Sequence, residues 1–188
     1  SGHLEWRDRD CHFIFGDVAT AVVVEAEPSG KQARLWEILG SRAMTSFSSN
    51  IRNNSGFLDR CEEGGRSDQR DKLFVQEGRK VFKEVCPMAA AHISDHLAQH
   101  GLKPADVKRF WLHQANLAMN QFISRRLLGR DAPLEEAPVV LDKYANTASA
   151  GSIIAFHQHQ ADLAPGATGV MCSFGAGYSI GSHVLRRV

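Results

Sequence analysis

The chain has 188 residues, of which 43% are hydrophobic and 23% are charged, and 22 basic against 21 acidic residues give a formal net charge of +1. This composition is typical of an ordinary globular domain and excludes a disordered chain, and the balanced charge excludes the basic surface that nucleic acid requires. No apolar run approaches the ~20 residues that span a bilayer, so we expect a cytoplasmic protein with no membrane and no nucleic-acid partner.

Residues 1–27 are expected to contribute β strands. Two β-rich runs, at residues 12–15 and 21–25, lie on either side of a segment that begins with Gly16, and this pattern predicts two strands joined or kinked at the glycine. Residues 28–72 are expected to form a linker and a variable polar loop, because Ser, Asn, Gly and charged residues dominate from Thr45 onward.

Residues 73–188 read as an α/β domain. Apolar residues at helical spacing predict a helix over residues 73–100, kinked or divided at Pro87 and ended by Gly101. A strand over residues 107–112 follows. The next apolar set predicts a second helix, which Asn116 is suited to cap and Gly129 to end.

The same plan then repeats. A strand is predicted over residues 139–141, a turn leads to Asn146, and a helix runs from about residue 147 to residue 163. Two last strands, over residues 170–174 and 179–188, are joined by a glycine loop. This order of elements predicts a mixed sheet with helices on both faces.

Three of the predicted strands end in groups that can donate hydrogen bonds. His113 follows the first, Asn146 the second, and the loop Gly175-Ala176-Gly177 the third. If these strands are parallel neighbours, the three groups meet at the carboxyl edge of the sheet, where open α/β sheets bind ligands. All three can stabilise an oxygen that becomes negative, such as an enolate or a tetrahedral oxyanion, and none is a nucleophile. The sequence therefore predicts half of an active site.

Each of these groups also has a plainer structural explanation. A single histidine is often structural, asparagine is common in turns, and glycines suit a tight hairpin. His157 and His159 do not indicate a metal, because positions i and i+2 do not share a helical face. The four cysteines lack metal-ligand spacing and show no sign of an activated thiolate. They are Cys11, Cys61, Cys86 and Cys172.

Four segments, in order, resemble the carboxyl-terminal half of beta-ketoacyl-acyl-carrier-protein synthase III: residues 15–21, 113–116, 144–149 and 173–182. The resemblance implies one half of the duplicated five-layer α-β-α-β-α thiolase fold, which pairs into a homodimer. It also implies an amino-terminal half that carries the nucleophilic cysteine, and no cysteine of this chain matches that residue. We therefore expect the isolated chain to be inactive.

The activity implied by the resemblance is a decarboxylating Claisen condensation that joins an acyl-CoA primer to malonyl-acyl-carrier protein and starts fatty-acid synthesis, with no cofactor. His113 and Asn146 would bond the malonyl thioester oxygen, and Ala176 would supply an oxyanion-hole N–H between Gly175 and Gly177. Phe174 would pack against the nucleophile, although an ordinary core position explains it equally well.

The acyl carrier protein would meet basic residues of the second helix. Leu117 and Ala118 stand where several members of the family have a basic residue, and Arg125 and Arg126 could supply that contact instead or form a solvated helix face. Two other functions stay open: a related thioester transferase that forms quinolones or condenses acyl groups head to head, and a non-catalytic dimerising or carrier-binding module.

Overall fold

The computed structural model describes residues 4, 11, 13–27, 35–52 and 74–188. Its centre is a four-stranded mixed sheet in the order β1-β6-β5-β4. The β6 strand pairs antiparallel with both β1 and β5, and β4 pairs parallel with β5. The four strands are β1 (Trp36–Ser48), β4 (Arg109–Leu112), β5 (Thr168–Gly175) and β6 (Gly177–Arg187).

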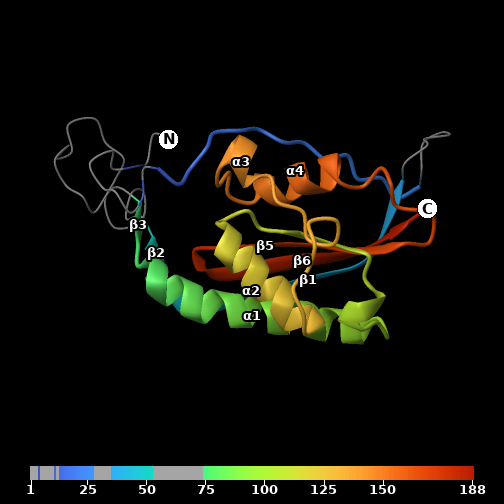
Figure 1. Cartoon of the computed structure of the whole chain (residues 1–188), viewed down its shortest axis with the longest axis horizontal. Coiled ribbons are helices and arrows are strands. Elements are labelled where there is room, and N and C mark those ends of the chain that lie inside the picture. Colours follow the sequence, from blue (N-terminus) through green and yellow to red (C-terminus); the bar gives the residue numbers. More distant parts are fainter. Residues whose placement is uncertain (1–3, 5–10, 12, 28–34, 53–73) are drawn as a thin grey trace.

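Helices cover both faces of this sheet (Figure 1). One face carries α1 (Gly78–Gln99) and α2 (Leu117–Leu128), and the other carries α3 (Leu141–Tyr144) and α4 (Ala150–Gln158). A short 3-10 helix, η2 (Pro104–Asp106), precedes β4. Near the start of α1, β2 (Ile51–Arg52) and β3 (Val75–Gln76) form a small antiparallel ribbon.

The main core lies between the sheet and the α1 and α2 layer. Val85, Ile93 and Leu97 form an apolar stripe on α1, and each is 0% exposed. Burying one such side chain contributes about 1.5–3 kcal/mol. The predicted helix is confirmed from Gly78 to Gln99, where it is one undivided element with Pro87 inside it, but Val75 and Gln76 of the predicted range form β3 instead. Gly101 follows the end of the helix at φ +69°. In α2, Asn116 caps the first turn and Gly129 the last, as the sequence predicted.

Aromatic rings hold α4 against the other face. Trp111 packs edge to face on Trp36 and Phe156, with ring centroids 5.2 and 4.9 Å apart. Gly169 makes room for the indole, because a Cβ there would lie 2.2 Å from Trp111 Cζ3. Trp111 Nε1 donates to the backbone oxygen of His159, just beyond α4. This contact sets the position of α4 relative to β4.

The amino-terminal third differs from the sequence prediction. Residues 36–48 fell in the expected linker, yet they form β1, which pairs with β6 from Trp36 opposite Arg187 to Ser48 opposite Gly177. Residues 13–27 form no strand, and Phe15 alone makes an isolated bridge to Asn146. The segment instead runs along the α3 and α4 side of the sheet (Figure 1). Residues 53–72 of the expected linker and polar loop lie outside the described residues.

The prediction of a strand at residues 139–141 is also wrong, although the segment before it runs beside β4. Phe110 N donates to Glu136 O at 2.7 Å, but Pro138 has no N–H with which to continue a ladder. The side chain of Gln114 bonds this segment in place of a neighbouring strand. Its Nε2 donates to Pro138 O at 3.2 Å, and its Oε1 accepts from Val140 N at 3.0 Å. A side chain therefore replaces strand pairing here, and Leu141 begins α3.

Candidate functional site

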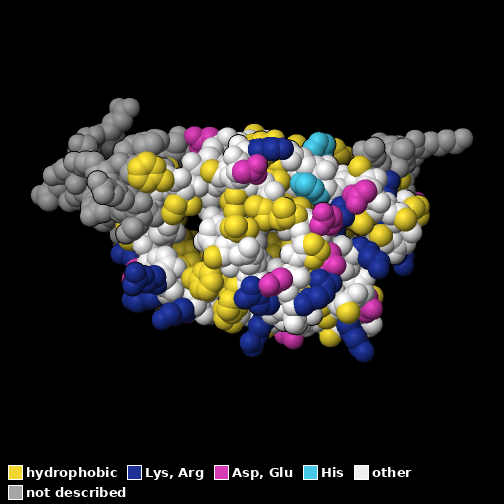
Figure 2. All heavy atoms as spheres, in the orientation of Figure 1, with side chains coloured by type: hydrophobic (Ala, Val, Ile, Leu, Met, Phe, Trp, Pro, Cys, Tyr) yellow, Lys and Arg dark blue, Asp and Glu magenta, His cyan; other side chains and the backbone are white. Residues whose placement is uncertain are grey.

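A cavity of about 980 Å³ opens at the carboxyl ends of β4 and β5. Figure 2 shows apolar side chains around a hollow on one face of the molecule. The walls come from residues 14–15, the turn at Asn146 and Ala148, the glycine loop, the β2 and β3 ribbon and the first turns of α1 and α2. The apolar lining consists of Ile14, Phe15, Ile51, Phe74, Val81, Phe82, Ala115, Met119, Ala148, Phe174 and Ala176.

The His113 side chain lines this cavity. It directly follows β4, is 6% exposed, and packs against Phe174 with ring centroids 4.5 Å apart. Burial disfavours the charged ring and lowers the pKa of His113 to about 4. Its Nδ1 has no hydrogen-bond partner among the described residues. At neutral pH the ring is therefore an uncharged hydrogen-bond donor next to an apolar wall.

The Asn146 amide is held at the same cavity by its own backbone. Asn146 N donates to Ile14 O at 2.9 Å, and Asn146 O accepts from Gly16 N at 3.0 Å. The side-chain Oδ1 accepts from Ala148 N at 2.9 Å, which leaves the Nδ2 group as the donor at the cavity wall. The sequence predicted this residue for the site, but it arrives from the turn after α3 and not from a strand end.

Backbone strain surrounds this amide. Ala145 and Ala148 have φ of +55° and +53°. A residue with a Cβ in such a conformation costs about 1–3 kcal/mol, which the surrounding structure must offset. Strain on both sides of a cavity-lining polar side chain is typical of functional sites.

The glycine loop joins β5 to β6 at the cavity. Gly175 and Ala176 line it, and Ser179 N donates to Ala176 O at 3.1 Å to close the turn. Within the described residues, the Ala176 N–H makes no hydrogen bond of its own. Gly177 is not part of the lining but is needed by the turn: its φ is +135°, and a Cβ would lie 2.7 Å from Ser179 N.

Gln114 also positions the site, a role that was not predicted from the sequence. It is fully buried between His113 and the segment that leads to Asn146. Gly151 on α4 makes room for it, since a Cβ there would lie 2.8 Å from Gln114 Cβ. The sequence did hold a signal for this role, since Gln114 comes directly after an apolar strand and its predicted end at His113. A glutamine buried at such a place must form hydrogen bonds, commonly with backbone groups.

Other candidate residues lie apart from the cavity. Arg125 and Arg126 are in the last turn of α2, where Arg125 pairs with Asp131. The basic residues that do line the cavity are Arg79 and Lys80, at the start of α1, and Lys80 pairs with Glu77. Neither residue was predicted from the sequence to lie at the site.

The described cysteines are not suited to be nucleophiles. Burial raises the pKa of both the Cys86 and the Cys172 thiols to about 12, so neither is ionised at neutral pH. Cys11 is also buried, and Cys61 lies outside the described residues. In the part of the chain that the structure covers, no three His, Cys, Asp or Glu side chains are grouped to hold a metal ion. No helix there has the length and apolar character to cross a membrane.

Known proteins are similar to this chain in sequence and in fold. Residues 97–187 match the family described as 3-oxoacyl-[acyl-carrier-protein (ACP)] synthase III C terminal. A Pseudomonas aeruginosa protein named beta-ketodecanoyl-[acyl-carrier-protein] synthase is 62% identical over 100% of this chain and 53% of its own length. A beta-ketoacyl-[acyl-carrier-protein] synthase III of Wolbachia pipientis is 30% identical over 97% of this chain and 54% of its own.

Solved structures agree with these sequence matches. The 3-oxoacyl-(acyl carrier protein) synthase III of Pseudomonas aeruginosa superposes with a TM-score of 0.74 at 22% identity, over 98% of this chain and 54% of that one. The enzyme of the same name from Aquifex aeolicus gives 0.73 at 23% identity, over 98% and 54%. The fold is therefore that of one half of a thiolase-fold protein.

In sequence and in fold, the chain is similar to the carboxyl-terminal half of beta-ketoacyl-acyl-carrier-protein synthase III. The resemblance and the fold class inferred from the sequence are confirmed. The chain spans about half the length of the curated relatives it matches.

Proposed function

We propose that this chain supplies the decarboxylating and oxyanion-binding half of a condensing active site, which joins an acyl-CoA primer to malonyl-acyl-carrier protein and starts fatty-acid synthesis. The observation that carries the proposal is the meeting of His113, Asn146 and Ala176 at one apolar cavity. Two side-chain donors and a backbone N–H, beside a phenylalanine, suit a reaction whose charge develops on thioester oxygens.

In the first step, the bond between the malonyl carboxylate and the α-carbon breaks. Its electron pair moves into an enolate, whose charge resides on the thioester oxygen, and carbon dioxide leaves. His113 and the Asn146 Nδ2 group donate hydrogen bonds to that oxygen. Each such donor in a dry site is worth about 3 kcal/mol of barrier. The Phe174 ring favours the departure of an uncharged product over a carboxylate.

In the second step, the enolate carbon forms a bond to the acyl carbon of a cysteine thioester, and the thiolate departs. That cysteine belongs, in this proposal, to an amino-terminal half. The tetrahedral intermediate places its charge near the glycine loop, where the Ala176 N–H is available. A neutral His113 can serve as this donor because one nitrogen of an uncharged imidazole ring still carries a hydrogen.

The acyl group that primes the reaction is proposed to be of medium length. The cavity walls are largely apolar, and the relative that is 62% identical is named a beta-ketodecanoyl synthase. A ten-carbon product arises when two carbons are added to an eight-carbon acyl group. We therefore expect octanoyl-CoA to be preferred over acetyl-CoA when acyl donors of increasing length are compared.

The proposed partners follow from this reaction. The acyl carrier protein is expected to contact Arg125 and Arg126, with Arg79 and Lys80 nearer the cavity. The active assembly is proposed to be a cytoplasmic homodimer in which each subunit has both halves.

Two measurements test the proposed function. In the full-length protein that contains this chain, His113→Ala or Asn146→Ala should each slow malonyl-thioester decarboxylation about 100-fold. Decarboxylation at the wild-type rate in both variants would support the non-catalytic module instead. Labelled acyl-CoA should leave no thioester on the isolated 188-residue chain, and a label on any of its cysteines would contradict the assignment of the nucleophile to another segment.

A further inference from the structure

A cluster of three hydrogen-bonded side chains lies beside the glycine loop. Tyr178 directly follows Gly177, is 2% exposed, and donates from its hydroxyl to Glu84 Oε2 at 2.8 Å. Asn50 Nδ2 lies 3.0 Å from the same Glu84 oxygen and 2.9 Å from the Tyr178 hydroxyl. Each member therefore bonds both of the others, although the three come from β6, α1 and the turn before β2.

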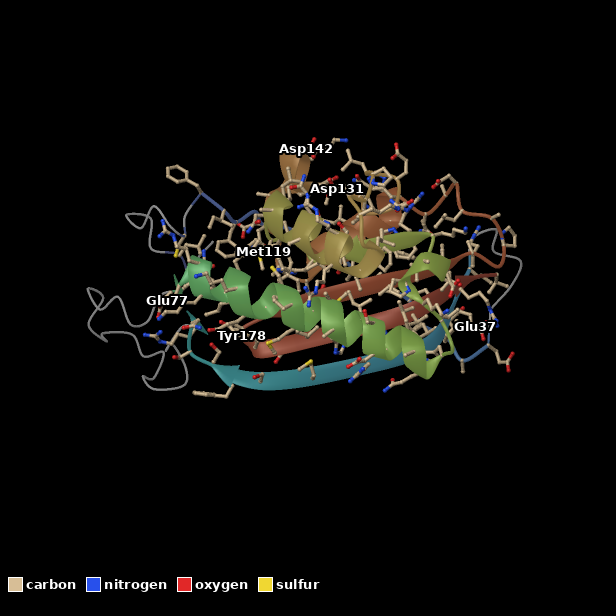
Figure 3. The ribbon with its side chains drawn as sticks, turned by 60° about the horizontal axis from the view of Figure 1, so that its bottom comes forward. Glu37, Glu77, Met119, Asp131, Asp142 and Tyr178 are labelled. Carbon is tan, nitrogen blue, oxygen red and sulfur yellow. The ribbon has the colours of Figure 1, made fainter. Side chains whose placement is uncertain are left out.

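The cluster joins two walls of the cavity. Asn50 O accepts from Glu77 N at 2.8 Å, at the residue before α1, and Asn50 N donates to Ser48 Oγ at 3.2 Å. Ser48 in turn pairs with Gly177. Glu77 lines the cavity, and Figure 3 shows Tyr178 at the same end of the molecule, while Glu37 lies at the opposite end. The glycine loop is thus connected through side chains to the start of α1.

A connection outside the loop adds to its order, because two of its three residues are glycines, which have more conformational freedom to lose on folding than any other residue. The turn itself is closed by the Ser179 N to Ala176 O bond, next to the strand pair of Gly175 with Ser179. A hydrogen bond to a carboxylate is stronger than one between neutral groups. The bond from the Tyr178 hydroxyl to Glu84 therefore restrains the residue that directly follows the loop.

We propose that Asn50, Glu84 and Tyr178 form a positioning cluster, which fixes the glycine loop so that the Ala176 N–H stays directed at the cavity. The inference rests on the proposed function of that N–H as an oxyanion donor. None of the three side chains lines the cavity, so they act through the loop and not on the substrate. A donor that stabilises charge only in the transition state affects kcat and leaves KM unchanged when it is misplaced.

The test compares three variants with a matched control. Tyr178→Phe removes one oxygen, Glu84→Ala removes the acceptor, and Glu84→Gln retains an acceptor oxygen. Glu37→Gln makes the same chemical change in an exposed pair with Arg186. Two quantities are measured: hydrogen exchange of the Ser179 amide in the 188-residue chain, and kcat and KM for the malonyl thioester in the full-length protein.

We expect Tyr178→Phe and Glu84→Ala to speed Ser179 exchange about 10-fold and to lower kcat about 10-fold at unchanged KM, which is the effect of about one hydrogen bond. Glu84→Gln should stay within about threefold of the wild type, and Glu37→Gln should match it.

Three results would overturn the inference. One is wild-type exchange and kcat in Tyr178→Phe, another is a raised KM at constant kcat, and the third is a lower melting temperature with no change in exchange or kcat. If the unsubstituted full-length protein fails to decarboxylate malonyl thioesters, the proposed function fails. The Ser179 exchange rates still decide whether the cluster holds the loop.

Discussion

The two helical layers of this molecule differ in how their residues are held. The α1 and α2 layer is regular: its apolar stripe is buried, and its helices end at glycines with positive φ. The α3 and α4 side is irregular, with a side chain in place of a strand ladder and two alanines at positive φ. The candidate site lies where the irregular side meets the sheet edge. The regular layer nevertheless supplies part of the lining of the cavity, from the first turns of α1 and α2.

Acid should destabilise both regions, because each contains a buried neutral histidine. Burial is the main cause that lowers the pKa of His96 on α1 and of His113 at the cavity from 6.5 to about 4. The unfolded chain takes up these protons first, so stability is complete above pH 6.5 and is lost as the pH falls toward 4. The expected loss is about 3 kcal/mol for each ring.

Urea unfolding between pH 7 and pH 4 measures this loss. His96→Gln and His113→Gln should each make the dependence of unfolding free energy on pH shallower by about 3 kcal/mol over that range. Parallel curves for the wild type and either variant would show that the substituted ring is not held neutral in the folded chain.

The regular layer should respond most strongly to a cavity. Ile93→Ala removes a fully buried side chain from the stripe on α1 and should lower the free energy of unfolding by about 3–4 kcal/mol. Phe47→Ala is the control, because Phe47 is 94% exposed and should change stability by less than about 0.5 kcal/mol. Equal effects of the two substitutions would contradict the placement of the core.

On the α3 and α4 side, stability should depend on the side-chain amide of Gln114. Gln114→Leu keeps the volume but leaves Val140 N and Pro138 O without their partner, at a cost of about 2–3 kcal/mol. Because Gln114 separates His113 from the segment that leads to Asn146, decarboxylation in the full-length protein should fall as well. A stable, fully active variant would show that the segment beside β4 needs no side-chain support.

The smallest expected effect is that of replacing an alanine by glycine, which should change stability in opposite directions in the two regions. Ala145→Gly relieves a backbone conformation that favours glycine and should stabilise the chain by about 1 kcal/mol. Ala90→Gly, in the middle of α1, should destabilise it by about 1 kcal/mol or more. Thermal unfolding of both variants measures the difference, and a loss of stability in Ala145→Gly would mean that the turn is not strained.

The sequence predicted the elements whose signals are local. The helix that Asn116 caps and Gly129 ends is an example, since the cap, the spacing and the stop lie within fifteen residues of one another. The strand β1 was missed because it is an edge strand with many exposed and polar positions, and its assignment depends on pairing with β6 far along the chain.

The wrong prediction of a strand at residues 139–141 has a different cause. Two valines and a leucine suit a strand, and the deciding contacts come from Gln114 and from the missing N–H of Pro138. The motifs nevertheless placed His113, Asn146 and the glycine loop at one location, and the structure brings them to a common cavity. Arg79 and Lys80 could not be placed there, because no local pattern tells which turn of a helix faces a cavity.

The burial of His113 also limits how the full-length protein can depend on acidity. Since burial lowers the pKa of the ring to about 4, the ring is uncharged throughout the neutral range, which is the form that the proposed donor role uses. A fall in rate between pH 6 and pH 8 would therefore report the ionisation of another group, such as the attacking thiol or the substrate carrier. The histidine itself would define only the acidic limit of the pH–rate profile.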